Sequence, residues 1–235
     1  MCTRTVRALI FTVPFILALL IPALLYADGG IYFEDILCKR DGRVAVNSSF
    51  DNGPRGWKLG PDSIITPPDK PFPSPTLYVD CHGKTRAADT YPVNMRDAGV
   101  VELHSYIYLP KVTEQAGYGR FISFAYLGIW PTTRGWNMYF GPKLYPKDDG
   151  YRIGILWNNG SPKAPEAVTE KAVLKPETWA LLSFYLDRTT GVASVYLDQK
   201  LQTSLEFDPD GFARIDSIGI QSWLGDRRDL PADKR

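Results

Sequence analysis

The sequence predicts an all-β fold, an antiparallel β-sandwich of jelly-roll type that follows an N-terminal export signal. Three observations predict it: apolar residues recur at every second position along most of the chain, Gly, Pro, Asn and Asp separate these runs, and no long stretch has helical spacing. Sandwiches of about 200 residues commonly form one domain. We therefore expect a single β-sandwich domain over residues 28–235, with an elaborated N-terminal segment over residues 28–76.

The N-terminus has the layout of a signal peptide. Arg4 and Arg7 precede an uncharged, largely apolar run over residues 8–25, and the short side chain of Ala27 follows. We expect residues 1–27 to be a signal peptide cleaved after Ala27, and the protein to be secreted or to lie in the periplasm or cell envelope. The alternative is an uncleaved anchor, which would be the only expected contact with a membrane.

Charge excludes one class of partner. The chain has 27 basic and 26 acidic residues, and removal of the signal takes away two arginines, which leaves 25 basic residues against 26 acidic ones. Nucleic-acid binding needs a basic surface that displaces counterions, and the mature chain has no block of Lys and Arg outside the neighbourhood of Asp226-Arg227-Arg228. We expect no nucleic-acid partner.

Cysteine use agrees with export. Cys2 leaves with the signal, and Cys38 and Cys81 remain as a pair in a compartment where thiols oxidise. We expect a Cys38–Cys81 disulfide, with two buried free thiols as the alternative.

No metal or other cofactor is expected. The chain has only two histidines, which argues against a zinc site. Asp148 and Asp149 make calcium conceivable, but two adjacent acids do not form a cage of oxygen ligands, so a solvated turn is expected there.

The strands are predicted in chain order. Residues 61–75 carry six prolines, which forbids a central strand and favours an extended loop leading into a strand at residues 77–80. The clearest strand covers residues 99–109, with one apolar face of Val101, Leu103, Ile107 and Leu109 and one polar-aromatic face of Glu102, His104, Tyr106 and Tyr108. Similar patterns predict strands over residues 120–127, 136–140, 151–157, 178–187, 192–198, 201–207 and 215–223.

Two short connections predict a meander late in the chain. Residues 187–191 and 198–200 are tight enough to join consecutive strands as hairpins. The strand that begins at Trp179 and the strand that ends with Tyr196-Leu197-Asp198 would then share one buried face.

This hairpin resembles the late hairpin of laminin-G-like and concanavalin A-like lectin/glucanase domains, where a Trp opens one strand and Tyr-x-Asp-Gly closes the next; here Gln199 stands in place of that Gly. The opening segment, residues 47–57, is similar to that of many bacterial members. The resemblance covers residues 179–223 and implies a concanavalin A-like jelly roll, in a superfamily that hosts lectins, adhesive modules, hydrolases and lyases. With the export signal and the loop aromatics, it favours an exported carbohydrate-binding or adhesive module with a polysaccharide or glycoconjugate as partner, and it leaves open whether the module is an enzyme.

Two alternatives stay open. The domain could be a polysaccharide-cleaving enzyme of the same superfamily, a glycoside hydrolase or lyase, or a structural envelope protein that binds no ligand.

Aromatic side chains near predicted loops are the candidates for sugar binding, because a sugar ring stacks on Trp or Tyr while amides and charged groups bind its hydroxyls. These candidates are Trp130, Arg134, Trp136, Trp157 and Asn158. Ordinary strand core is the alternative for Trp136 and Trp157.

Two groups of residues could carry catalysis. Glu206 and Asp208 alternate with Asp210 and resemble the acidic strand of laminarinase-type hydrolases, although Pro209 indicates a solvated turn. Glu102, His104 and Tyr106 share one strand face and could supply a general base. The alternative for this group is a polar face under a loop.

Overall fold

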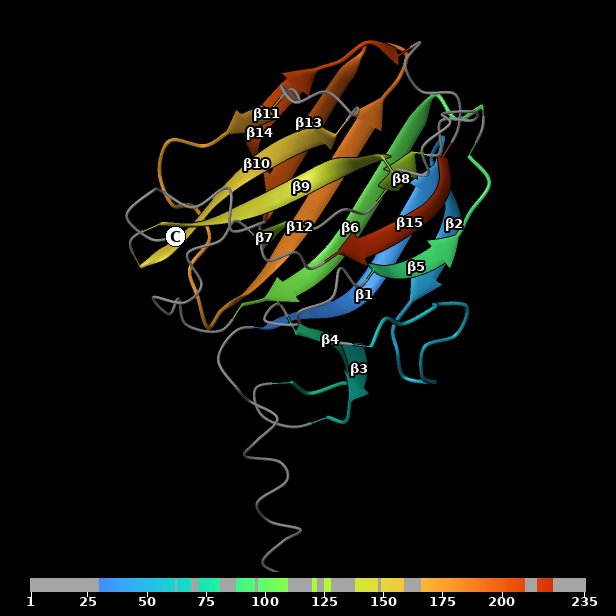
Figure 1. Cartoon of the computed structure of the whole chain (residues 1–235), viewed down its shortest axis with the longest axis vertical. Helices are drawn as coiled ribbons and strands as arrows, with labels where there is room; N and C mark the ends of the chain where they lie inside the picture. The colour runs from blue at the N-terminus through green and yellow to red at the C-terminus, as the bar shows by residue number, and fades with distance from the viewer. Residues whose placement is uncertain are drawn as a thin grey trace, which may run out of the picture.

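The protein is an all-β antiparallel sandwich, which confirms the predicted fold class (Figure 1). The computed structural model describes fifteen strands and some of their connections, over residues 30–61, 63–68, 72–80, 88–95, 97–109, 120–121, 125–127, 138–147, 149–158, 166–209 and 215–221.

The larger sheet has eight strands, of which seven form a continuous ladder and β2 (Arg43–Ser48) pairs with β1. The ladder runs in the order β14 (Lys200–Glu206), β13 (Val192–Leu197), β12 (Trp179–Asp187), β6 (Val100–Tyr108), β1 (Gly30–Arg40), β4 (Thr76–Asp80) and β3 (Ser63–Thr66).

The second sheet has seven strands and lies across the first in Figure 1. The strand β7 (Arg120–Phe121) pairs with β9 at one side of the main ladder. That ladder has the order β11 (Glu166–Val168), β10 (Gly150–Asn158), β9 (Met138–Lys147), β8 (Ala125–Leu127), β15 (Ile215–Gln221) and β5 (Ala88–Pro92).

One apolar core fills the space between the sheets. The side chains predicted to point inward from β6, β12 and β13 are buried there, among them Leu103, Phe184 and Val195. Phe140 and Ile153 face them from the second sheet. Because burial of one such side chain is worth about 1.5–3 kcal/mol, this alternation accounts for the stacking of the two layers.

The strand β1 was not predicted, and a local irregularity explains why. Phe33 and Ile36 are both buried in the core although they are three residues apart. Asp35 between them has a φ of 51°, and the register with β6 shifts between Glu34 and Leu37. This bulge breaks the two-residue period on which the prediction depended, because it inserts residues that do not alternate.

Both predicted hairpins form. The Asp187 carboxylate accepts hydrogen bonds from the backbone N–H groups of Thr189 (2.8 Å) and Thr190 (3.2 Å), and β13 begins after Gly191. The connection from β13 to β14 is a two-residue turn, with a φ of 47° at Asp198 and 66° at Gln199. The proline-rich segment, predicted to be an extended loop, instead contains the strand β3, which has no proline and lies at the edge of the sheet, so the prediction that no central strand forms there holds.

The predicted Cys38–Cys81 disulfide is absent from the structure, because Cys38 is a free, buried thiol. Cys81 lies outside the described residues but directly follows Asp80, which pairs with Gly30 at the far end of β1 from Cys38. Burial, with a further effect of Glu102, raises the pKa of Cys38 to about 12.

The signal segment, residues 1–27, lies outside the described residues, so export and cleavage after Ala27 stay predictions. None of the described segments forms a helix long and apolar enough to cross a membrane.

Candidate functional site

The face of the eight-stranded sheet that points away from the core is called the outer face below, and it carries polar, aromatic and a few apolar side chains. Strand register fixes which of its side chains meet. Lys39, Glu102 and Tyr185 lie side by side on β1, β6 and β12. His104 and Ser183 occupy the neighbouring row on β6 and β12.

A hydrogen-bonded polar cluster lies at the centre of the outer face. His104 Nδ1 lies 2.9 Å from Ser183 Oγ, and His104 Nε2 lies 3.4 Å from Glu102 Oε2. Lys39 Nζ lies 3.6 Å from the same Glu102 oxygen. The side chains of His104 and Glu102 are 16% and 18% exposed, so neighbouring groups hold their orientation while one edge still reaches solvent.

Tyrosine rings border this polar cluster. The ring of Tyr185 contacts His104 edge-on at a centroid distance of 5.5 Å, and Tyr196 contacts Tyr185 at 5.2 Å. Tyr106, next along β6, is 43% exposed. Desolvation, with further effects of Glu102 and Tyr196, raises the pKa of Tyr185, so its hydroxyl stays protonated at neutral pH and can donate a hydrogen bond.

The other end of the outer face is closed by its own side chains. Phe72, from the proline-rich segment, stacks on Tyr32 at 4.2 Å and contacts Trp179 edge-on at 5.7 Å. Tyr78 and Tyr108 complete this aromatic cluster, in which Phe72 is 2% exposed. Trp179, the residue that opens the family-like hairpin, therefore packs against structural neighbours.

Exposed large apolar side chains are concentrated on the same sheet. In the described part of the chain they are Val44, Ile64, Tyr106 and Leu201, and all four belong to strands of the eight-stranded sheet. Register pairs Val44 with Lys39 and Leu201 with Tyr196. Since cross-strand partners point to the same side, these apolar groups extend the outer face around the polar cluster.

Part of this site was predicted from the sequence, and the rest was not. It placed Glu102, His104 and Tyr106 together on one strand face, and the structure brings Glu102 and His104 into one cluster. Lys39 and Ser183 were missed because they come from strands distant in sequence. No local pattern in the sequence predicts which strands pair with β6.

The second pair of candidate acids lies elsewhere. Glu206 ends β14, the edge strand, and Asp208 follows in the loop; both are exposed. β14 is three strands away from β6, which corresponds to about 14 Å at the usual strand spacing. Two cooperating carboxylates must lie within about 10 Å of each other, so Glu206 and Glu102 are not brought together for glycoside hydrolysis.

The predicted sugar-binding residues are only partly described. Trp157 is 9% exposed and packs in the core against Phe207 and against Phe140, at a ring-centroid distance of 5.9 Å from the latter. Trp157 is therefore a core residue of its strand, as the alternative interpretation expected. Asn158 ends β10, and nothing is described of its side chain. The other candidates and one calcium candidate lie outside the described residues: Trp130, Arg134, Trp136 and Asp148. Asp149 is exposed in the turn that precedes β10, and the described residues contain no group of three metal-binding side chains.

No known protein family and no curated protein matches the sequence. Solved structures give distant similarities. An alginate lyase from Pseudomonas aeruginosa is 12% identical over 75% of this chain and 91% of that chain, with a TM-score of 0.35. The binding domain of Paraclostridial Mosquitocidal Protein 1 is 10% identical over 84% of this chain and 50% of that chain, with a TM-score of 0.28.

The exoplasmic/lumenal domain of VIP36, in a form bound to Ca²⁺ and Man3GlcNAc, is 10% identical over 63% of this chain and 86% of that chain, with a TM-score of 0.25. We draw neither family nor function from similarities of this size.

Proposed function

We propose that the protein is a carbohydrate-binding or adhesive module and that the open part of the outer face is its contact surface. The observation that carries this proposal is the placement of Tyr185 between the polar cluster and Tyr196, in reach of both. Export of the protein, which the N-terminal sequence predicts, would give such a surface access to polysaccharides and glycoconjugates.

The chemistry of a sugar matches this surface in two ways. A pyranose presents a C–H face that packs on an aromatic ring, and Tyr106, Tyr185 and Tyr196 offer rings on three neighbouring strands. Its hydroxyl groups need donors and acceptors at fixed positions. Glu102 offers acceptors and Lys39 offers donors beside those rings.

The same groups support binding better than bond cleavage. The raised pKa of Tyr185 makes its hydroxyl a poorer proton acceptor than that of an ordinary tyrosine, while it can still donate a hydrogen bond to a ligand. A glycoside hydrolase needs a second carboxylate near Glu102, and the candidate Glu206 is about three strand spacings away.

The test is affinity electrophoresis and titration of the purified protein with a panel of neutral and acidic polysaccharides. Tyr185→Ala is expected to weaken binding at least tenfold, because the stacking ring is lost. Tyr185→Phe keeps the ring, and Tyr145→Ala removes a ring from β9 on the other sheet; both are expected to bind nearly as the wild type does.

Unchanged binding by a folded Tyr185→Ala protein would overturn the assignment of the outer face. Failure of the wild type to bind any member of the panel would favour the structural alternative. Release of new reducing or unsaturated ends from the panel would identify an enzyme instead.

A further inference from the structure

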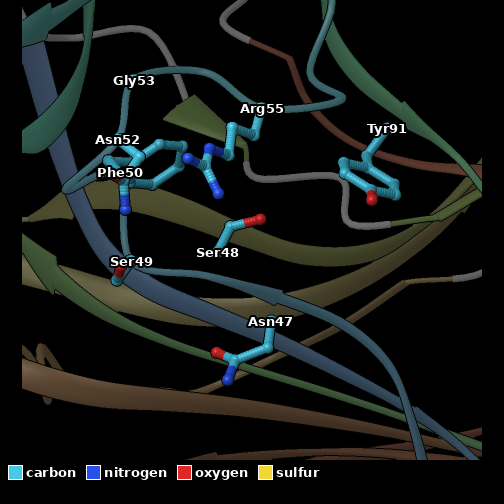
Figure 2. A pocket seen from close by; sticks show the side chains of 8 residues that line it. All are labelled: Asn47, Ser48, Ser49, Phe50, Asn52, Gly53, Arg55 and Tyr91. Atoms are coloured by element: carbon cyan, nitrogen blue, oxygen red, sulfur yellow. The ribbon is translucent and has the colours of Figure 1, made fainter.

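A pocket lies apart from the outer-face site, where the turn segment after β2 meets β5. Its cavity measures about 340 Å³ and is lined by Asn47, Ser48, Ser49, Phe50, Asn52, Gly53, Arg55 and Tyr91 (Figure 2). None of these residues was among the candidate ligand-binding or catalytic residues predicted from the sequence. The volume falls in the lower range of small-ligand sites, which suits one or two sugar units.

The pocket wall is a preorganised loop. Gly53 N–H donates to the Phe50 carbonyl (2.9 Å) and Trp57 N–H donates to the Pro54 carbonyl (2.7 Å), so two tight turns follow each other. Two backbone hydrogen bonds between Lys58 and Thr90, of 2.8 and 3.0 Å, fasten the end of the loop to β5. A loop held in this way loses little further entropy when it binds a ligand.

Phe50 holds a strained backbone at the base of the pocket. Its φ is 62°, in the left-handed region that a bulky side chain rarely adopts. Its ring is 3% exposed and contacts Trp57 at a centroid distance of 6.2 Å, and Trp57 Nε1 donates to Ser48 Oγ at 3.0 Å. Core packing therefore maintains a conformation that shapes the pocket.

Tyr91 forms the opposite wall because Gly56 leaves room for its ring. A Cβ atom on Gly56 would lie 2.5 Å from Cε2 of Tyr91, and Gly56 has a φ of 79°. The Tyr91 ring also contacts Trp57 edge-on at 5.7 Å. The close approach positions an aromatic ring of fixed orientation beside the polar groups of the loop.

The polar lining has one formal charge. Arg55 is exposed, and Figure 2 shows its side chain reaching into the pocket toward Ser48, with Phe50 on one side and Tyr91 on the other. None of the eight lining residues is acidic, and the ion pairs among the described residues do not include Arg55. The nearby carboxylate of Asp51 accepts a hydrogen bond from Ser49 (2.8 Å).

We propose that this pocket binds a carboxylated sugar, with the carboxylate on Arg55. A guanidinium matches a carboxylate through two parallel hydrogen bonds, which a neutral sugar cannot make. Ser48 and Asn52 add polar groups to the lining that suit the ring hydroxyls, and Tyr91 offers a surface for the apolar face of the ring.

The test is a titration of the purified protein with glucuronic acid, its methyl ester, glucose and inorganic phosphate. Binding is monitored through NMR chemical shifts of the protein. The protein is made in a host without N-glycosylation, because Asn47-Ser48-Ser49 fits the acceptor pattern. Glucuronic acid is expected to bind at least tenfold more tightly than the ester or glucose. Arg55→Gln should abolish that preference, and Arg55→Lys should keep only part of it.

Arg43→Gln is the matched control, since it removes an exposed arginine from β2 outside the pocket and should leave binding unchanged. Tyr91→Ala should weaken the binding of glucuronic acid and leave polysaccharide binding through Tyr185 unchanged. This difference separates the pocket from the outer face. The proposal would be overturned if glucuronic acid and its methyl ester bound equally well, or if Arg55→Gln kept the preference for the acid. It would also be overturned if phosphate bound as tightly as glucuronic acid does.

Discussion

Asp41 and Val100 are joined by two hydrogen bonds although 58 residues separate them in sequence. The Asp41 N–H donates to the Val100 carbonyl at 2.9 Å, and the Asp41 carboxylate accepts from the Val100 N–H at 2.9 Å and from the Gly99 N–H at 2.9 Å. The turn between β1 and β2 thus fixes the start of β6, the strand that carries Glu102 and His104.

The charged Asp41 carboxylate should therefore stabilise the folded protein only at pH values above its pKa. The hydrogen bond from Val100, with that from Gly99 and the charge of Arg40, outweighs desolvation and lowers the pKa of Asp41. A lowered folded-state pKa means that the stabilisation is present above the unfolded value, near 4, and is lost as the pH falls through the folded value. Asp41→Asn keeps an acceptor and tolerates a φ of 48°, so it isolates the charge.

We expect Asp41→Asn to lower the free energy of unfolding by up to about 1 kcal/mol at neutral pH, a small value because the side chain is 47% exposed. The difference from wild type should shrink toward zero near pH 2. Urea unfolding at both pH values measures it, and a difference that persists at low pH would contradict the charge argument.

Glu34 should behave in the opposite sense. Desolvation, with further effects of Asp35 and Asp51, raises its pKa, and Ser74 donates a hydrogen bond to its carboxyl group. A raised pKa means that the folded state favours the protonated carboxyl, so this contribution to stability falls as the pH rises from about 4.5 through the folded value. Glu34→Gln keeps the acceptor without the charge.

Glu34→Gln is therefore expected to be more stable than wild type at neutral pH and equally stable below about pH 4. Thermal unfolding followed by circular dichroism at the two pH values tests this. Asp35→Asn, which removes one of the two like charges, should give a smaller gain, and a loss of stability in Glu34→Gln at pH 7 would refute the explanation.

The alternation of residues could predict the faces of the strands because a strand's period is local. Val101, Leu103 and Ile107 are buried as predicted, and Tyr106 is exposed on the other side. The position of β1 beside β6 is a property of strand pairing, which no local period encodes. The bulge at Asp35 removed even the local signal for β1.

The candidate site could likewise be predicted only in part, namely where its residues share one strand. Glu102 and His104 share one strand and could be grouped from sequence, whereas Lys39 and Ser183 join them only through the pairing of three strands. The pocket around Arg55 depends on three left-handed backbone positions in one loop, and of these Phe50 carries no sequence signal because bulky residues rarely adopt that conformation.

Cys38 should be unreactive in the folded protein. Its side chain is fully buried and its pKa is raised to about 12, so the thiolate fraction at pH 8 is on the order of one in ten thousand. Iodoacetamide treatment at pH 8 followed by peptide mapping is expected to leave Cys38 unmodified without urea and to modify it in urea. A Cys38–Cys81 cross-linked peptide in a non-reducing map would show that the thiol is not free.

The turn between β13 and β14 offers a stabilising substitution. Asp198 and Gln199 both have positive φ values, of 47° and 66°, the pattern of a type I′ turn, which prefers Gly at its second central position. The Asp198 carboxylate accepts a hydrogen bond from the Leu181 N–H at 2.9 Å, so Asp198 has a reason to stay, whereas the exposed side chain of Gln199 makes no hydrogen bond or ion pair with the other described residues.

Gln199→Gly is expected to raise the free energy of unfolding by about 0.5–1 kcal/mol, because relief of the left-handed strain exceeds the extra entropy that Gly gives to the unfolded chain. Gln199→Ala removes the same side chain without relieving the backbone, so it should leave stability nearly unchanged in urea unfolding. Gly191 allows the reverse experiment, because its φ is 69° and a Cβ atom there would lie 2.8 Å from the Phe207 carbonyl oxygen. Gly191→Ala should therefore lower the free energy of unfolding. Equal stabilities of Gln199→Gly and Gln199→Ala would show that the turn bears no backbone strain.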